Sequence, residues 1–379
     1  MENQFDALEA FEFAAQHQLK TFVLGGGSNI LVSDEGFNGL VIKVVNKGIE
    51  VIAPLIPSRP KPKCHSEAEW RDPSTGRMHS SVGMVDESED RNRILLKVAS
   101  GEVWDEVVKF AVKNNWWGIE NLSHIPGSTG AIAVQNVGAY GQEASGVIES
   151  VTVFNKDTHS IQNFQNADCG FAYRQSIFNS SDKGKYIIFD ITFKLLKSAK
   201  PNLEYRDLKN YFGLGGTLSV ASKATSPPEG ENADVPALSD IRNAIISIRN
   251  KKFPFPVEAK KGNAGSFFKN PILSPDEYIV LRHQLAYKFG LEAANNLEQK
   301  KFTDNGQIKV PAAFLIDLCG LKNLKSGGAA INQNQPLVIT NESGTASAKD
   351  VLNLANQVKQ EVFNKTGLTL KFEPELIGF

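Results

Sequence analysis

The chain reads Gly262-Asn263-Ala264-Gly265-Ser266-Phe267-Phe268-Lys269-Asn270-Pro271, and this stretch decides how the rest of the sequence is interpreted. Its two glycines let the backbone come close to a ligand that side chains would otherwise obstruct. The hydroxyl of Ser266, held still in a dry pocket, can deliver a proton to a reacting carbon. The alternative interpretation is a hairpin turn followed by a hydrophobic strand, so the function depends on the motifs around it.

The composition is that of a globular protein with two or three domains. Its 379 residues are 41% hydrophobic and 22% charged, with a formal net charge of −1, which gives no reason to expect nucleic acid as a partner. The first residues lack the pattern of a signal peptide, and no apolar run approaches the length of a membrane span. Three scattered cysteines and six scattered histidines indicate neither a disulfide framework nor a metal site. We therefore expect a cytoplasmic enzyme without a metal.

Hydrophobic periodicity predicts a mixture of helices and short strands, and hence an α+β fold. Helices are expected over 8–17 and 238–251, around Trp104, Val107, Val108 and Ala111, and from a capping box at Ser347 to Gly367. Pro254 and Pro256 are expected to end the helix over 238–251. Strands are expected over 20–24, 30–32, 94–99, 151–154, 187–193 and 368–372. Polar tracts over 54–92 and 213–236 predict a disordered insertion and a loop insertion.

Two clusters of small residues could accept a phosphate-bearing ligand. The turn Gly25-Gly26-Gly27-Ser28-Asn29 presents consecutive backbone N–H groups to an anion, although it lacks the spacing of a dinucleotide fingerprint. A second cluster, 125–141, would let a flat aromatic cofactor lie directly on the backbone. A purely structural turn remains open as the explanation of each cluster.

A few charged side chains lie in apolar surroundings. Arg174 follows Tyr173 between aromatic residues, where its planar fork suits a carboxylate. Glu375 follows an apolar segment near the end of the chain, and Lys252 and Lys269 are candidate phosphate contacts. Taken singly, each of these also fits a surface position.

In their order along the chain, these segments resemble the UDP-N-acetylenolpyruvoylglucosamine reductase (MurB) family. The resemblance covers most of the chain outside the two insertions, and the tyrosine-bearing loop around Tyr205 is similar to the type I branch. Its segments are 24–31, 120–141, 170–178, 252–256, 262–271, 311–330 and 372–375.

The resemblance implies an FAD-binding fold of the PCMH/VAO type with two subdomains, followed by a C-terminal α+β substrate-binding domain. The implied boundaries are 1–98 for the first subdomain, 99–200 for the second with 371–379 returning to it, and 201–370 for the substrate domain. The family begins with a further strand that approaches the flavin, and Met1 falls after it. We therefore expect a shortened first subdomain with weakened FAD binding.

The implied reaction has two halves, with NADPH as co-substrate. NADPH reduces the flavin, and the flavin then reduces the enolpyruvyl ether of UDP-N-acetylglucosamine for peptidoglycan synthesis. The resemblance assigns Ser266 as the proton donor, with Arg174 and Glu375 holding the charge that develops on the substrate carboxylate. Glu375 would act in a protonated form, which implies a raised pKa.

The remaining implied contacts divide between cofactor and substrate. Substrate contacts are expected from Tyr173, Tyr205, Lys252 and Asn270. FAD contacts are expected from Gly25, Gly26, Gly27, Ser28, Asn29, Pro126, Gly127, Ser128, Gly130, Asn136, Gly138, Ala139 and Tyr140. The chain is expected to work as a monomer, without a membrane or nucleic-acid partner. A related flavoprotein with another substrate and an inactive, nucleotide-binding homologue remain as alternatives.

Overall fold

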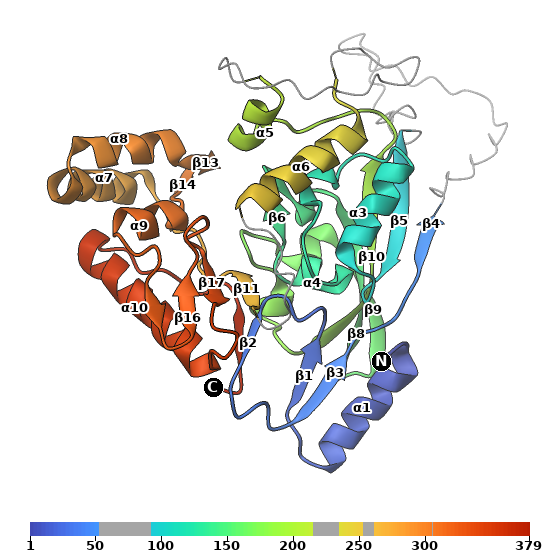
Figure 1. Ribbon diagram of the computed structural model, residues 1–379. Helices are drawn as coiled ribbons and strands as arrows, with labels where there is room; N and C mark the ends of the chain where they lie inside the picture. The colour runs from blue at the N-terminus through green and yellow to red at the C-terminus, as the bar shows by residue number, and fades with distance from the viewer. Residues whose placement is uncertain (53–91, 215–234, 253–260, 305) are drawn as a thin grey trace, which may run out of the picture.

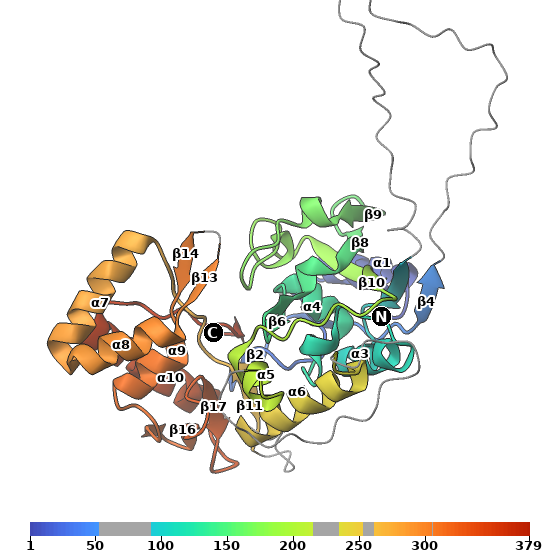
Figure 2. The same cartoon turned by 90° about the horizontal axis from the view of Figure 1, so that it is seen from above.

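The structure is a computed structural model, and it describes residues 1–52, 92–214, 235–252, 261–304 and 306–379. Most of the two expected insertions, and the expected stop at Pro254 and Pro256, lie outside the described residues. The described chain forms two bodies, one around residues 1–252 and one around the C-terminal residues, as Figure 2 shows from above.

A five-stranded antiparallel sheet is the centre of the larger body. The order of its strands is β4 (Ile49–Ile52), β5 (Arg93–Ala99), β10 (Tyr186–Leu196), β8 (Ile148–Asn155) and β9 (Ser160–Gln165). Neighbouring residues of a strand point to opposite faces, and here both faces are covered. Val153 and Ile188 face one core, whereas Phe154 and Phe189 face another.

Two helices, α3 (Trp104–Lys113) and α4 (Thr129–Val134), cover one face of this sheet (Figure 1). The apolar residues of α3 recur at the helical spacing and are fully buried, so the predicted helix is confirmed: Trp104, Val107, Val108 and Ala111. Irregular structure follows, with short elements η1 (Glu120–Leu122), β6 (Gly138–Ala139), β7 (Gln142–Glu143), η2 (Ala144–Gly146), η3 (Asn166–Cys169) and η4 (Ile177–Asn179).

The N-terminal residues cover the other face of the sheet. Helix α1 (Gln4–Gln16) begins before the expected residue 8, because Asn3 and Asp6 form a capping box. Strand β1 (Thr21–Leu24) pairs in parallel with β3 (Leu40–Lys43), and β2 (Ile30–Val32) follows the glycine turn. The strands predicted over 20–24 and 30–32 are therefore confirmed.

Two further helices, α5 (Arg206–Tyr211) and α6 (Leu238–Lys252), pack on the larger body. The apolar face of α6 meets Trp117 and Tyr140 in one core, and Arg242 of α6 forms two hydrogen bonds of 2.8 Å with Asp105 of α3. Helices α5 and α6 therefore pack with the larger body, although the expected substrate domain began at 201. Likewise β5, expected to close the first subdomain, lies in the central sheet beside β10.

The C-terminal body has its own core and two small antiparallel sheets. One sheet holds β11 (Asn263–Ser266), β17 (Val338–Asn341), β16 (Ala329–Ile331) and β15 (Lys325–Ser326), and the other holds β12 (Ile272–Leu273), β14 (Gln307–Lys309) and β13 (Phe302–Asp304). The helices are α7 (Pro275–Phe289), α8 (Leu291–Lys300), α9 (Ala312–Leu318) and α10 (Ala348–Thr366). The capping box at Ser347 and the left-handed Gly367 bound α10 as predicted.

The last residues depart from expectation. No regular strand forms over 368–372, where Phe372 makes a single bridge with Phe268. The strand is β18 (Glu375–Ile377), which pairs in parallel with β2. Residues 371–379 were expected to return to the second subdomain, but their backbone pairs with β2 of the first.

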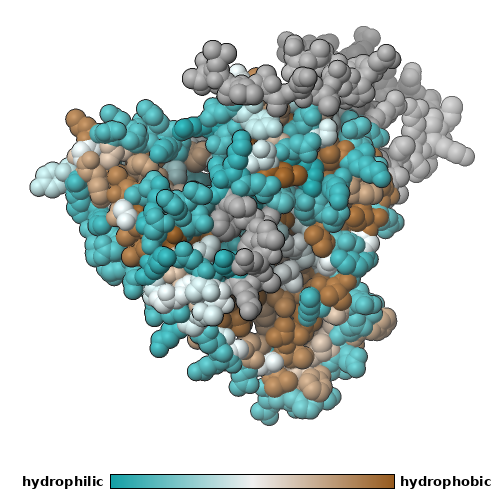
Figure 3. All heavy atoms as spheres, in the orientation of Figure 1, coloured by the Kyte–Doolittle hydropathy of each residue, from teal (hydrophilic) through white to brown (hydrophobic). Residues whose placement is uncertain are grey.

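Apolar side chains gather on the face over β1 and β3 (Figure 3). Among the helices that the structure describes, none is both long and apolar enough to cross a membrane.

Candidate active site

Arg174 and Glu373 form a buried ion pair where distant segments meet. Tyr173 and Arg174 occupy the tip of a tight hairpin closed by hydrogen bonds between Ala172 and Gln175, and Arg174 adopts a positive φ of 53°. Its Nε donates to Glu373 Oε1 at 3.0 Å and its Nη2 donates to the carbonyl of Gly138 at 2.7 Å. The two side chains are only 17% and 10% exposed, so the pair is shielded from water.

Glu373 is surrounded by further polar groups. Gln135 Nε2 donates to the same Oε1 at 3.4 Å, and Asn29 Nδ2 donates to the backbone carbonyl of Glu373 at 3.2 Å. Burial raises the pKa of Glu373, while Arg174 and the ammonium of Lys269 oppose that rise. Burial also lowers the pKa of Lys269, whose Nζ donates to the carbonyl of Arg174 at 3.2 Å.

Ser266 lies at the end of β11, close along the backbone to Glu373. The carbonyl of Phe267 accepts from the Glu373 N–H at 3.0 Å, and the N–H of Lys269 donates to the carbonyl of Lys371 at 2.8 Å. Residues 266–269 and 371–373 therefore run side by side. Gly265 has a φ of 70°, and among the described residues no other atom lies within 4 Å of where its Cβ would stand. Approach of a ligand to this backbone stays a prediction.

Glu375 does not reach Arg174 in this structure. Its Oε1 pairs with Lys183 Nζ at 2.7 Å, and both side chains are substantially exposed. The chain bends at Pro374, leaving the bridge between Phe372 and Phe268 and joining β2, which turns Glu375 away from Arg174. Arg174 pairs with Glu373 instead, and the catalytic role of Glu375 stays a prediction.

The two glycine clusters pack against each other. Ser28 Oγ donates to the carbonyl of Pro126 at 3.2 Å. A Cβ on Gly26 would lie 2.6 Å from the Cα of Gly127, so the absence of a side chain lets two backbones touch. Asn29 links this turn to Glu373 through Gln135, whose Oε1 accepts from Asn29 Nδ2 at 2.5 Å. The turn thus reaches the ion pair.

Several residues of the second cluster have partners within the protein. Asn136 is buried and bonds with Glu143, Ala172 and Ser145. A Cβ on Gly130 would lie 2.8 Å from the Cβ of Ser100. Part of this cluster therefore supports local packing, and direct contact of these residues with a cofactor remains a prediction.

The expected substrate contacts fall into two groups. Tyr173 Oη accepts from the Asn270 N–H at 3.3 Å, beside the ion pair. Tyr205 lies between Tyr140 and Phe302, with ring centroids 5.3 and 5.9 Å away, and burial raises its pKa to about 12. Lys252 forms an ion pair with Asp207 near that second group.

Sequence reasoning missed Glu373, Gln135 and Phe302. Glu373 lies in the Phe372–Glu375 segment that was singled out, but the resemblance directed attention to the later carboxylate. Gln135 carried the weak signal of a polar side chain inside the second glycine cluster. Nothing in its own stretch of sequence marks Phe302.

Comparisons with known proteins identify the family of the chain. The model of the UDP-N-acetylenolpyruvoylglucosamine reductase C-terminal domain matches residues 256–377, and that of an FAD-binding domain matches 79–161. The UDP-N-acetylenolpyruvoylglucosamine reductase of Neisseria meningitidis is 37% identical over 93% of this chain and 83% of its own length. That of Flavobacterium johnsoniae is 33% identical over 94% of this chain and 87% of its own.

The chain belongs to the UDP-N-acetylenolpyruvoylglucosamine reductase family. The crystal structure of MurB from Thermus caldophilus, 21% identical, covers all of this chain and 90% of its own with a TM-score of 0.56, so the fold is shared. The predicted α+β fold, with an FAD-binding part and a C-terminal domain, is confirmed. The chain is accordingly an FAD-dependent oxidoreductase of this MurB family.

The residues present fit FAD, the cofactor of the family. In the described part of the chain, no hydrogen bond uses the backbone N–H groups of Gly26, Gly27 or Ser28. Gly26 and Gly27 are exposed, and Gly27 has a φ of 71° with only Leu24 near the place of a Cβ. Free N–H groups at an open glycine turn are the donors that a diphosphate needs.

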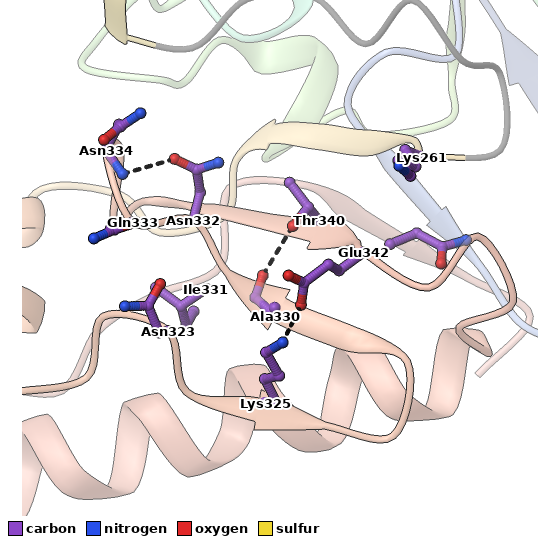
Figure 4. A pocket seen from close by; sticks show the side chains of 11 residues that line it. Lys261, Asn323, Lys325, Ala330, Ile331, Asn332, Gln333, Asn334, Thr340 and Glu342 are labelled. Atoms are coloured by element: carbon purple, nitrogen blue, oxygen red, sulfur yellow. Dashed lines mark hydrogen bonds and ion pairs between the residues drawn. The ribbon is translucent and has the colours of Figure 1, made fainter.

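A separate surface pocket lies on the sheet of the C-terminal body, with a volume of about 370 Å³ (Figure 4). In this pocket Lys325 pairs with Glu342 at 2.7 Å, and Thr340 donates to the carbonyl of Ala330 at 3.3 Å. None of the predicted site residues lines it. Its lining residues are Lys261, Asn323, Lys325, Ala330, Ile331, Asn332, Gln333, Asn334, Thr340, Asn341 and Glu342. The ion pair of Arg174 and Glu373, rather than this pocket, therefore defines the candidate active site.

Proposed function

We propose that the chain reduces the enolpyruvyl ether of UDP-N-acetylglucosamine to UDP-N-acetylmuramate, with FAD as cofactor and NADPH as co-substrate. The observation that carries the proposal is the meeting of three distant segments at the ion pair of Arg174 and Glu373. The glycine turn reaches this pair through Asn29, and the Ser266 stretch reaches it through the carbonyl of Phe267. These contacts support a site in which the proposed cofactor turn, a cation and the proposed proton donor lie together.

The turn Gly25–Asn29 and the segment Pro126–Ser128 would hold FAD, with further contacts from Gly130, Asn136, Gly138, Ala139 and Tyr140. The bound flavin supplies the hydride-transfer chemistry that side chains cannot provide. The protein residues bind the substrate, orient it, exclude water and move the proton.

Arg174 binds the carboxylate of the enolpyruvyl group. Adding hydride to the double bond places negative charge on this carboxylate, and a guanidinium in a shielded site stabilises that charge. Ser266 gives its proton to the carbon next to the carboxylate, which completes the lactyl ether. Glu375 remains a candidate partner in this step, on the family resemblance.

The nucleotide end of the substrate is proposed to contact Tyr205 and Lys252, and Tyr173 and Asn270 are proposed to contact the substrate beside Arg174. Lys252 pairs with Asp207 and so faces the loop that carries Tyr205. We further propose that the enzyme works in the cytoplasm as a monomer, where it serves peptidoglycan precursor synthesis.

A spectrophotometric assay tests this function directly. Purified protein, reconstituted with FAD where necessary, is mixed with NADPH. Oxidation of NADPH is followed as the loss of its absorbance at about 340 nm, with and without the enolpyruvyl sugar nucleotide. We expect NADPH to bleach the flavin, and continuous oxidation to require the sugar nucleotide. Flavin reduction without a response to that substrate would favour a related flavoprotein, and failure to bind FAD would favour an inactive homologue.

A further inference from the structure

We propose that Glu373 is a positioning residue for this reaction: its carboxylate holds the Nε side of Arg174, so that the guanidinium presents its Nη edge to the substrate carboxylate. The inference rests on the proposed function, and it assigns a role to a carboxylate other than Glu375.

Among the described residues, the hydrogen bonds of Arg174 leave Nη1 unused, and Nη1 lies 3.2 Å from where a Cβ on Gly138 would stand. An arginine has five N–H groups in a rigid plane. Glu373 accepts from Nε, the carbonyl of Gly138 accepts from Nη2, and the Tyr173 ring lies 5.2 Å from the guanidinium carbon. Within the described part of the chain, no hydrogen bond uses Nη1. Nη1 and the second hydrogen of Nη2 together match the two oxygens of a carboxylate.

Arg174 needs such a partner because its backbone does not fix the side chain by itself. It stands at the tip of a hairpin with φ of 53°, a conformation that residues other than glycine seldom adopt. An arginine side chain also has many rotamers, and a buried ionic contact restricts them. The hydrogen bond from Nε thus selects one orientation of the guanidinium plane.

Glu373 is itself held rigidly from several sides. Its N–H bonds to the carbonyl of Phe267, next to Ser266, and its own carbonyl accepts from Asn29. Gln135 donates to the carboxyl of Glu373, and Lys269 donates to the carbonyl of Arg174 in the hairpin. The same residue therefore sets the position of the cation relative to the proton donor and to the glycine turn.

The test is a double-mutant cycle with Glu373→Gln, Arg174→Lys and the combined variant. Lysine keeps the charge of Arg174 but lacks the planar guanidinium, so a contact with Glu373 cannot orient a second edge toward the substrate. In the parent, E373Q is expected to raise KM for the enolpyruvyl sugar nucleotide by about ten- to a hundredfold, the range for losing a charged hydrogen bond. In the R174K background, E373Q is expected to change KM by less than about threefold, because lysine has no planar edge for Glu373 to orient.

Flavin reduction by NADPH is measured in the same variants, and E373Q is expected to keep that rate within about twofold. E342Q, an exposed carboxylate paired with Lys325, is the control and should leave both half-reactions unchanged. Equal, additive effects of E373Q in both backgrounds, or slowing of both half-reactions together, would overturn the proposal.

If E373Q does not fold, the cycle is run with E373D, which keeps the charge but shortens the reach. A smaller rise in KM that vanishes in the R174K background supports the proposal, and an additive rise refutes it. Failure of the proposed function is seen separately, because the parent itself would then show no oxidation that depends on the sugar nucleotide.

Discussion

Ser266 ends β11 one residue before the peptide carbonyl that accepts from Glu373. If its hydroxyl gives the proton to the substrate carbon, Ser266→Ala should leave flavin reduction by NADPH intact. It should slow reoxidation by the enolpyruvyl substrate by about 10²- to 10⁴-fold, the usual contribution of a positioned acid. Stopped-flow absorbance of the flavin measures both half-reactions. Ser326→Ala, in β15 of the same sheet, is the control, and equal slowing of both half-reactions by S266A would refute the role.

Gly26 shows how little room separates the two glycine clusters. A methyl group there would lie 2.6 Å from the Cα of Gly127 and 3.0 Å from the nitrogen of Ser128, so backbone would have to move. Gly26→Ala is expected to cost about 1–3 kcal/mol of unfolding free energy, as overpacking does, and to weaken FAD binding. Urea unfolding and flavin titration measure the two effects.

The matched control is Gly146→Ala, because nothing lies within 4 Å of a Cβ at that position. It is expected to change the unfolding free energy by less than about 1 kcal/mol. A G26A variant as stable as G146A, with unchanged affinity for FAD, would contradict the close contact of the two loops.

For single residues, the sequence predicts which side chains belong to the site better than it predicts which partners they contact. The aromatic surroundings of Arg174 predict that it binds a substrate carboxylate, which stays a prediction, and in the structure its partner is the carboxylate of Glu373. The choice between Glu373 and Glu375 depends on the bend at Pro374 and on pairing with β2, more than 340 positions earlier in the chain. A local pattern contains no information about such a distant strand.

At the level of elements, helix α10 begins with a cap that comes from far along the chain. Asp34, which follows β2, accepts from the N–H of Ala348 at 2.7 Å and from that of Lys349 at 3.1 Å. Asp34→Ala is expected to lower the unfolding free energy by about 1 kcal/mol, since it leaves two N–H groups at a positive helix end without an acceptor. Urea unfolding provides the measurement. The neighbouring Glu35→Ala should have no comparable effect, and equal losses in both variants would argue against the cap.

The short helix η1 carries a buried acid that should make stability depend on pH. Burial raises the pKa of Glu120 above its ordinary value of 4.5, against the N–H of Gly118, which donates to its carboxyl at 2.7 Å. The folded state therefore binds more protons than the unfolded state above pH 4.5, so its contribution to stability falls as pH rises from there to the folded pKa.

Glu120→Gln keeps an acceptor for Gly118 and removes the titration. The difference in unfolding free energy between E120Q and the parent should therefore shift in favour of E120Q between pH 4.5 and pH 8. Urea unfolding at both pH values measures this shift, with the exposed Glu106→Gln on α3 as control. A difference that is the same at the two pH values would rule out the buried titration.

The elements that could be predicted are those whose signals are local. The buried face of α3 and both ends of α10 could be predicted, because the spacing of apolar residues and the capping residues lie within the segments themselves. The strand expected over 368–372 is wrong for the opposite reason. Its alternation is suitable for a strand, but the available partner strand is β2, and it pairs with 375–377.

For the whole molecule, the division into bodies follows from packing rather than from order along the chain. Helix α6 was expected in the substrate domain, yet its apolar face lies against Trp117 and Tyr140 of the larger body. Tertiary contacts of this kind decide to which body a helix belongs. Composition predicts only approximately where along the chain one body ends and the next begins.

Near the proposed nucleotide site, the hairpin of β13 and β14 in the C-terminal body contacts the larger body. Phe302 stacks on Tyr205 with ring centroids 5.9 Å apart and an interplanar angle of 11°, and Lys309 Nζ lies 4.1 Å from the ring centre of Tyr173. Because Tyr205 is proposed to bind the nucleotide, its stacking partner in the C-terminal body should affect how firmly the cleft holds that substrate.

Phe302→Ala removes the stack while leaving Tyr205 in place. A ring pair is worth about 0.5–1.5 kcal/mol, so KM for the enolpyruvyl sugar nucleotide should rise about two- to tenfold. Flavin reduction by NADPH should be unchanged, and stability little affected, because Phe302 is 42% exposed. Ile272→Ala, 40% exposed in the same small sheet, is the control. If KM rises equally in both variants, the effect comes from the small sheet as a whole and not from the ring pair. If KM is unchanged in F302A, the hairpin of β13 and β14 does not contribute to substrate binding.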